Sequence, residues 1–115
     1  KHMKDKILKN ISIAEALELK ELVSYQDGQI VSRTLVQNAA VSITLFAFDT
    51  GEEISAHESK GDALVTILDG SGVITIVEKQ YALTAGQSIV MPAGIPHSVR
   101  AASPFKMLLM VVFPT

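Results

Sequence analysis

Two histidines, His57 and His97, are the side chains of this sequence best suited to chemistry. A neutral imidazole binds transition-metal ions and accepts a proton near neutral pH, so each residue is a candidate catalytic base or metal ligand. The chain has no cysteine, which excludes disulfides, thiolate nucleophiles and cysteine-based zinc sites. The remaining histidine, His2, precedes Met3 in what we interpret as a tag remnant (residues 1–2), so it is not a site candidate.

The residues that must position these histidines form short apolar runs separated by turn residues. The runs are rich in β-branched side chains, which predicts an all-β sandwich or barrel of many short strands. The expected strands are 21–25, 30–36, 41–48, 63–68, 72–77, 80–84, 88–91 and 105–113. In the second half of 41–48, apolar residues occupy both faces of the strand. Its two faces should therefore both be buried, or one of them should meet a partner subunit.

The residues before the barrel are expected to form an arm with one short helix. Ser12 and Glu15 have the spacing of a capping box, which predicts a helix over 13–19. A helix this short is stable only when it packs on another element. The predicted organisation is an arm and short helix at 3–20 followed by one barrel domain at 21–115, a size that suits a single domain.

Glycines and prolines stand at fixed distances from both histidines. The first stretch contains Gly51, then His57, Ser59, Ala63 and Gly70, and the second contains Gly86, then Pro92-Ala93-Gly94 and His97. Together they resemble the paired signature of the cupin superfamily, and the resemblance covers residues 51–101. It implies a small RmlC-like cupin, whose fold is a jelly-roll barrel, or double-stranded β-helix.

The resemblance also identifies a site that is only partly present. In metal-binding cupins, four positions converge inside the barrel and carry His, His, Glu and His. The corresponding residues here are His57, Ser59, Ala63 and His97. We expect these four to line an interior ligand pocket, with His57 and His97 as the remaining metal ligands. Asp62 joins them only if a bulge near Gly61 turns its side chain inward. With only two histidine ligands, we expect the site to bind a divalent transition metal weakly or to bind no metal at all.

Three functions are compatible with this site. The first is binding of a small molecule in the barrel, with a degenerate metal site. The second is a cupin enzyme of the dioxygenase, isomerase or epimerase type, which uses a metal or takes His57 or His97 as catalytic base. The third is a dimeric structural module, in which the two imidazoles are simply buried and bonded to backbone or water. A homodimer is expected under all three, and the apolar segment 105–113 is its expected interface.

Charge and hydropathy exclude other classes of partner. The formal net charge is −2 and the basic residues are scattered, unlike the clustered basic face of a nucleic-acid-binding protein. No run of about 18 apolar residues is present, so neither a transmembrane helix nor a membrane partner is expected. Because the chain has no cysteine and does not start like a secretory signal, we expect it in the cytoplasm.

Overall fold

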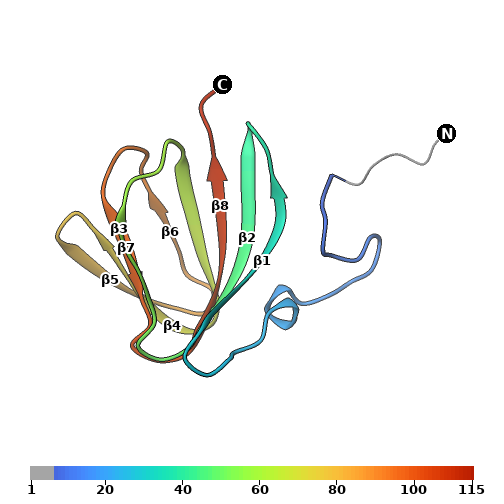
Figure 1. The fold of residues 1–115 in the computed structure, drawn as a ribbon, viewed down its shortest axis with the longest axis horizontal. Helices are drawn as coiled ribbons and strands as arrows, with labels where there is room; N and C mark the ends of the chain where they lie inside the picture. Colours follow the sequence, from blue (N-terminus) through green and yellow to red (C-terminus); the bar gives the residue numbers. More distant parts are fainter. Residues whose placement is uncertain (1–6) are drawn as a thin grey trace.

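The computed structural model describes residues 7–115, which form eight strands and one 3-10 turn (Figure 1). The turn is η1 (Leu19–Leu22), and the strands are β1 (Ile30–Gln37), β2 (Val41–Phe48), β3 (Glu53–His57), β4 (Asp62–Ile76), β5 (Lys79–Thr84), β6 (Ser88–Met91), β7 (His97–Arg100) and β8 (Phe105–Val112). All strand pairs are antiparallel, which confirms the predicted all-β class. No helix in this part of the chain is long and apolar enough to cross a membrane. Residues 1–2 and the first part of the predicted arm, 3–6, lie outside the described residues.

Strand β4 belongs to both sheets of the barrel. Its first half lies between β8 and β6 in a sheet of order β1-β2-β8-β4-β6, and its second half lies between β5 and β7 in a sheet of order β5-β4-β7-β3. The sequence predicts two strands here, 63–68 and 72–77. Instead, β4 is one continuous strand with a bulge between Ile67 and Asp69. Gly70 follows the bulge with a φ of +71°, and it has no Cβ to collide with the Pro104 carbonyl.

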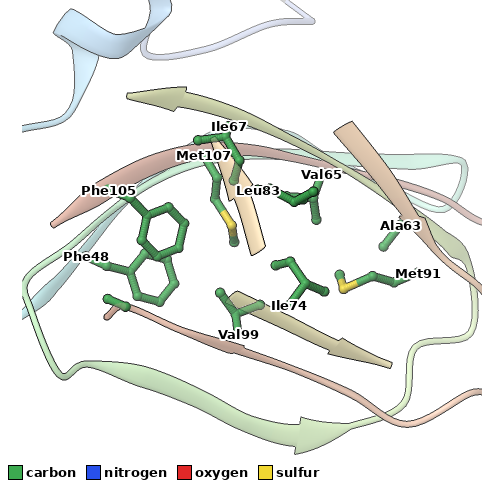
Figure 2. Packing of buried hydrophobic residues seen from close by; sticks show 11 residues of the cluster. Phe48, Ala63, Val65, Ile67, Ile74, Leu83, Met91, Val99, Phe105 and Met107 are labelled. Carbon is green, nitrogen blue, oxygen red and sulfur yellow. The ribbon is translucent and has the colours of Figure 1, made fainter. Parts of the chain in front are cut away.

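The interior between the two sheets is filled by apolar side chains (Figure 2). Phe48 and Phe105 lie at one end, with stacked rings whose centroids are 4.6 Å apart. Ala63 and Met91 face each other across β4 and β6 at the other end. The second sheet adds Ile74 and Val99 to this cluster, so burial of these side chains holds the two sheets together.

The outer face of β2 is covered by the segment before β1, residues 7–29, which is called the N-terminal arm from here on. Leu45 and Ala47 are fully buried there, in a cluster with Val23 and Leu35. The inward residue Phe48 is buried as well, so this strand has apolar cover on both faces, as its sequence predicts. The cover on the outer face comes from the same chain.

The predicted helix over 13–19 is wrong. Residues 11–18 contain no helix or strand, and Ala14 has a positive φ of 59°. Only η1 follows, and it replaces the expected strand at 21–25. The physical reason is packing. Ile11 and Leu19 both contact the apolar cluster that covers β2, and an irregular segment lets both side chains reach it.

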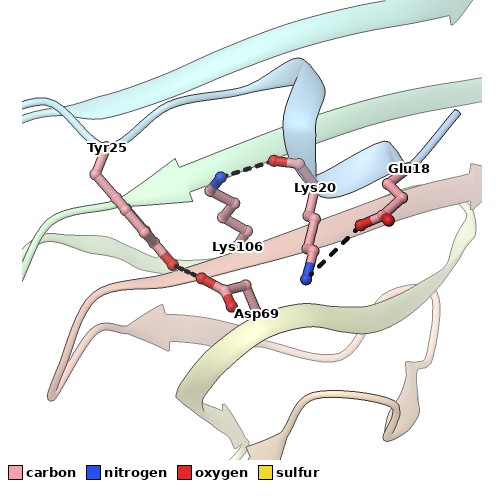
Figure 3. A network of polar contacts seen from close by, with 5 residues as sticks. All are labelled: Glu18, Lys20, Tyr25, Asp69 and Lys106. Carbon is pink, nitrogen blue, oxygen red and sulfur yellow. Dashed lines mark hydrogen bonds and ion pairs between the residues drawn. The ribbon is translucent and has the colours of Figure 1, made fainter.

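Polar contacts attach the arm to the barrel (Figure 3). The Tyr25 hydroxyl donates to the Asp69 carboxylate at 2.6 Å, and Lys106 Nζ donates to the Lys20 carbonyl at 2.7 Å. The same ammonium lies 5.0 Å from the centre of the Tyr25 ring. Burial, together with the neighbouring Asp69 carboxylate, raises the pKa of Tyr25, so its hydroxyl remains a donor at neutral pH.

Removing the Tyr25 hydroxyl should weaken this attachment without damaging the barrel. For Tyr25→Phe we expect the free energy of unfolding in urea to fall by about 0.5–1.5 kcal/mol, the range for one hydrogen bond. The matched control is Tyr81→Phe, because the Tyr81 hydroxyl makes no hydrogen bond within residues 7–115. Equal losses in the two variants would contradict a role of the Tyr25–Asp69 bond in holding the arm.

Candidate functional site

His57 and His97 lie directly opposite each other on β3 and β7. Ile54 pairs with Val99 and His57 pairs with His97, so β3 uses three residues where β7 uses two. This bulge places Ile54 and His57 on the same face of the sheet. In a regular strand, Ala56 would take the inward position and His57 would point out of the barrel.

The two imidazole rings meet edge to face, with centroids 4.5 Å apart. Each ring is oriented by a carbonyl two residues earlier: His57 Nδ1 lies 3.0 Å from the Ser55 oxygen, and His97 Nδ1 lies 3.0 Å from the Ile95 oxygen. A carbonyl oxygen only accepts, so Nδ1 carries the proton in both neutral rings. Both Nε2 atoms are then unprotonated and able to accept a hydrogen bond or bind an ion.

The histidine pair lies at the end of the barrel away from the two stacked phenylalanines. His97 pairs with Ile76 on β4, and Phe105 packs next to Gly72, four residues earlier on the same strand. Four residues of strand span about 13 Å. His57 is exposed at this end, whereas only 3% of the His97 surface is accessible. One histidine of the pair is therefore in contact with solvent, and the other lies in the interior of the barrel.

The other two predicted pocket residues have different environments. Ala63 points into the core and is buried. Ser59 lies in the loop between β3 and β4, where its Oγ accepts from the Gly61 amide at 3.2 Å. Its carbonyl accepts from the Gly94 amide at 2.9 Å, so the loop after the first histidine is bonded to the turn before the second.

Asp62 does not join the histidines. Its side chain is exposed, on the opposite face of β4 from Ala63, and its Oδ1 accepts from the Ala93 amide at 2.9 Å. The inward rotation of Asp62 near Gly61 is therefore not observed. Asp62 instead holds the Pro92-Ala93-Gly94 turn, a role that the sequence analysis missed because the two residues are 31 positions apart in the chain.

A full metal centre does not fit these residues. Within residues 7–115, no three His, Asp or Glu side chains come together in a way that would hold an ion. The donor set offered here is two imidazole Nε2 atoms, because Ser59 and Asp62 are bonded to backbone amides and Ala63 carries only a methyl group. Transition-metal sites in proteins generally have three or four protein ligands, which these residues do not supply.

Burial lowers the pKa of His97 below its ordinary value. The bond to the Ile95 carbonyl opposes this effect, and the nearby His57 adds to the lowering. His97 is therefore neutral at pH 7, with its Nε2 lone pair free.

The lowered pKa of His97 predicts a loss of stability on acidification. Above the unfolded pKa of about 6.5, the residue is neutral in both states. Below it, the unfolded chain binds a proton that folded His97 resists, so the free energy of unfolding falls as the pH drops. In urea titrations at pH 7.5 and 5.5, wild type should lose more stability than His97→Gln. An identical pH dependence in the two proteins would contradict this.

Four hollows on the described surface lie elsewhere. Two are formed by the arm and β1, and two lie beside Lys60 and Phe113. Neither histidine lines any of the four. His57 is the exposed member of the pair, so a ligand would approach from the side of its ring.

Comparison with known proteins identifies the family. Residues 44–113 match the cupin domain, described as Cupin_2. The chain belongs to the cupin superfamily. This confirms the resemblance drawn from the two motifs and the jelly-roll fold that it implies.

Two solved structures share nearly the whole fold of this chain. A conserved protein of unknown function from Streptococcus pyogenes is 48% identical, with a TM-score of 0.94 over 96% of this chain and 97% of that one. A cupin superfamily protein from Desulfitobacterium hafniense is 34% identical, with a TM-score of 0.89 over 93% of this chain and 98% of that one.

Among curated proteins, the chain is similar to part of a regulator. Over 79 residues it is 40% identical to the HTH-type transcriptional regulator PuuR of Escherichia coli. This match covers 62% of the present chain. The match covers 41% of the length of that regulator.

Proposed function

We propose that this cupin binds a small organic molecule at the His57–His97 end of its barrel and does so without a resident metal. The observation that carries the proposal is the pair of oriented imidazoles, each with its Nδ1 on a backbone carbonyl and its Nε2 free. The strand register places Ile54, Val99 and Ile76 beside the two imidazoles, and ligand sites commonly combine apolar side chains with a few polar groups. The ligand would donate hydrogen bonds to one or both Nε2 atoms.

Two further observations support binding over metal chemistry. The four family ligand positions hold only two donors of the metal-binding type, and Asp62 does not replace the missing carboxylate. The similarity to part of a transcriptional regulator also favours a domain that senses a small molecule. Ligand sensing requires a site that binds reversibly, which a two-imidazole pair in an apolar barrel can provide.

A thermal-unfolding screen tests this proposal. Metal-stripped protein is heated with carboxylic acids, amines, sugars and aromatic compounds, and separately with Fe²⁺, Mn²⁺, Ni²⁺, Cu²⁺ and Zn²⁺. A ligand at 100 times its Kd stabilises the folded state by about 2.7 kcal/mol. We expect at least one organic compound to raise Tm, and calorimetry to give a Kd that weakens at least tenfold in His57→Ala.

The matched control is Gln80→Ala, an exposed polar residue on β5 that should leave the Kd unchanged. Binding that persists in both His57→Ala and His97→Gln would place the ligand elsewhere. A screen in which only metal ions stabilise the protein would contradict the metal-free site.

A histidine-based enzyme is the second candidate, favoured by one observation. His97 is buried, has a lowered pKa and presents an unprotonated Nε2, as a general base must. Incorporation of solvent deuterium next to the carbonyl of a sugar or keto acid, lost in His97→Gln, would support it. No incorporation into any compound that binds would leave binding as the function.

A further inference from the structure

One row of side chains runs across all four strands of the second sheet, on its inward face. The strand register pairs Lys79 on β5 with Ile76 on β4, Ile76 with His97 on β7, and His97 with His57 on β3. Residues paired across strands project to the same face of a sheet, and Ile76 packs against the barrel core. The row therefore places a lysine on the same wall of the barrel as the two imidazoles.

Lys79 is held at the histidine end of this wall by its own hairpin. Its ammonium nitrogen lies 5.2 Å from the centre of the Tyr81 ring, and Tyr81 packs against the barrel core. At the turn, the Val77 amide donates to the Pro96 carbonyl at 2.9 Å, which joins the hairpin to the chain entering β7. The backbones of Lys79 and His97 are two strands apart, about 10 Å, so one small molecule can contact both side chains.

The charge of Lys79 is not balanced on this face. Within residues 7–115, its ammonium makes no ion pair, and Glu78, its neighbour in the turn, does not pair with it. The next row of the same face contains no carboxylate either; it consists of Tyr81, Ile74, Val99 and Ile54. A ligand of the histidine pair therefore meets a positive charge and no negative charge along this wall.

We propose that the ligand of the His57–His97 site is a hydroxy-carboxylic acid, and that Lys79 determines this specificity. The inference rests on the proposed function, since it names the class of molecule bound at the same pair. The carboxylate of the ligand accepts from the Lys79 ammonium. A hydroxyl at the other end of the molecule donates to a free imidazole Nε2. The apolar body between them lies over the half-buried Ile76.

Other classes of ligand satisfy this wall less well. An amine is a cation at neutral pH and meets Lys79 with like charge. A neutral sugar gains no charge-assisted bond from the ammonium. An acid without a hydroxyl pairs with the ammonium but leaves both Nε2 acceptors without a donor. A hydroxy acid supplies both the negative charge and the donor.

Calorimetric titration of metal-stripped protein tests the assignment with two acids, 4-hydroxybenzoate and 6-hydroxyhexanoate. Each acid is compared with its methyl ester, which lacks the charge, and with benzoate or hexanoate, which lacks the hydroxyl. We expect at least one of the two acids to bind, and its ester and its deoxy analogue to bind at least tenfold more weakly. Binding of neither acid overturns the assignment, as does an ester that binds as tightly as its acid.

Variants of the lysine test its role directly. Lys79→Met should weaken binding of the acid at least tenfold and leave binding of the ester unchanged, whereas Lys79→Arg keeps the charge and most of the affinity. The matched control is Arg100→Gln, which removes one positive charge from the opposite face of the same sheet, where Arg100 pairs with Glu53. Equal weakening by Lys79→Met and Arg100→Gln would mean that only net charge matters, and would overturn the role of Lys79.

The dependence on His57 separates this inference from the proposed function. If amines or neutral sugars bind with a Kd that depends on His57 but not on Lys79, the small-molecule site stands and the hydroxy-acid assignment is wrong. If an acid binds with a Kd that depends on Lys79 but on neither histidine, the pair is not the site and both proposals are wrong. The same titrations of His57→Ala and His97→Gln decide between these results.

Discussion

Phe105→Ala should lower the free energy of unfolding by about 4 kcal/mol, within the range for removing a fully buried aromatic ring. The ring has no accessible surface and stacks on Phe48, and a Cβ at Gly72 would lie only 2.7 Å from it. Because both sheets pack around this ring, its loss leaves a cavity at the point where β4 passes between them. Urea unfolding followed by far-UV circular dichroism measures the change.

Phe113→Ala is the matched control, since Phe113 follows β8 and is only partly buried. It should cost less than half as much as Phe105→Ala. Because domains of this size have a total stability of about 5–15 kcal/mol, the Phe105 variant should also be partly unfolded at 37 °C. Equal losses in the two variants would mean that the stacked pair does not anchor the barrel.

His97→Ala should be the second most damaging change, with a loss of about 2–4 kcal/mol. It removes the imidazole of a residue with only 3% of its surface accessible and leaves the Ile95 carbonyl without its donor. His57→Ala removes an exposed ring and should cost under about 1 kcal/mol. The same urea titrations measure both variants.

The two histidine variants therefore separate structure from binding. His57→Ala should fold normally and still lose affinity for any ligand of the site. His97→Gln keeps a polar group in the interior and serves when His97→Ala is too unstable to assay. If His57→Ala is as unstable as His97→Ala, the exposed ring has a structural role and the proposed division is wrong.

The jelly-roll fold could be predicted from the sequence because glycine and proline stand at fixed distances from the two histidines. The continuity of β4 could not be predicted, because Asp69-Gly70 is compatible with a turn as well as with a continuous strand. The tight contact of Gly70 with the Pro104 carbonyl decides between them, and it joins residues far apart in the chain. The arm was mispredicted for a similar reason: local capping signals favoured a helix, but packing on Leu45 and Ala47 determined its path.

The approach of the two histidines is predictable only through the motif resemblance. Counting residues along a regular β3 places His57 outside the barrel, and the bulge between Ile54 and His57 reverses this. The hydrogen bond from Ala93 to Asp62 was not predictable, because it joins a loop to a strand 31 residues away. Tertiary contacts of this kind leave no local pattern in the sequence.

The most direct test of the site is a long-range ¹H–¹⁵N NMR spectrum of the imidazole rings at pH 7.5. The structure predicts that His57 and His97 are both protonated at Nδ1 and unprotonated at Nε2. It further predicts that an organic ligand found by the screen shifts both Nε2 signals in metal-free protein. Rings protonated at Nε2, or Nε2 signals that respond only to metal ions, would contradict a small-molecule site built on this pair.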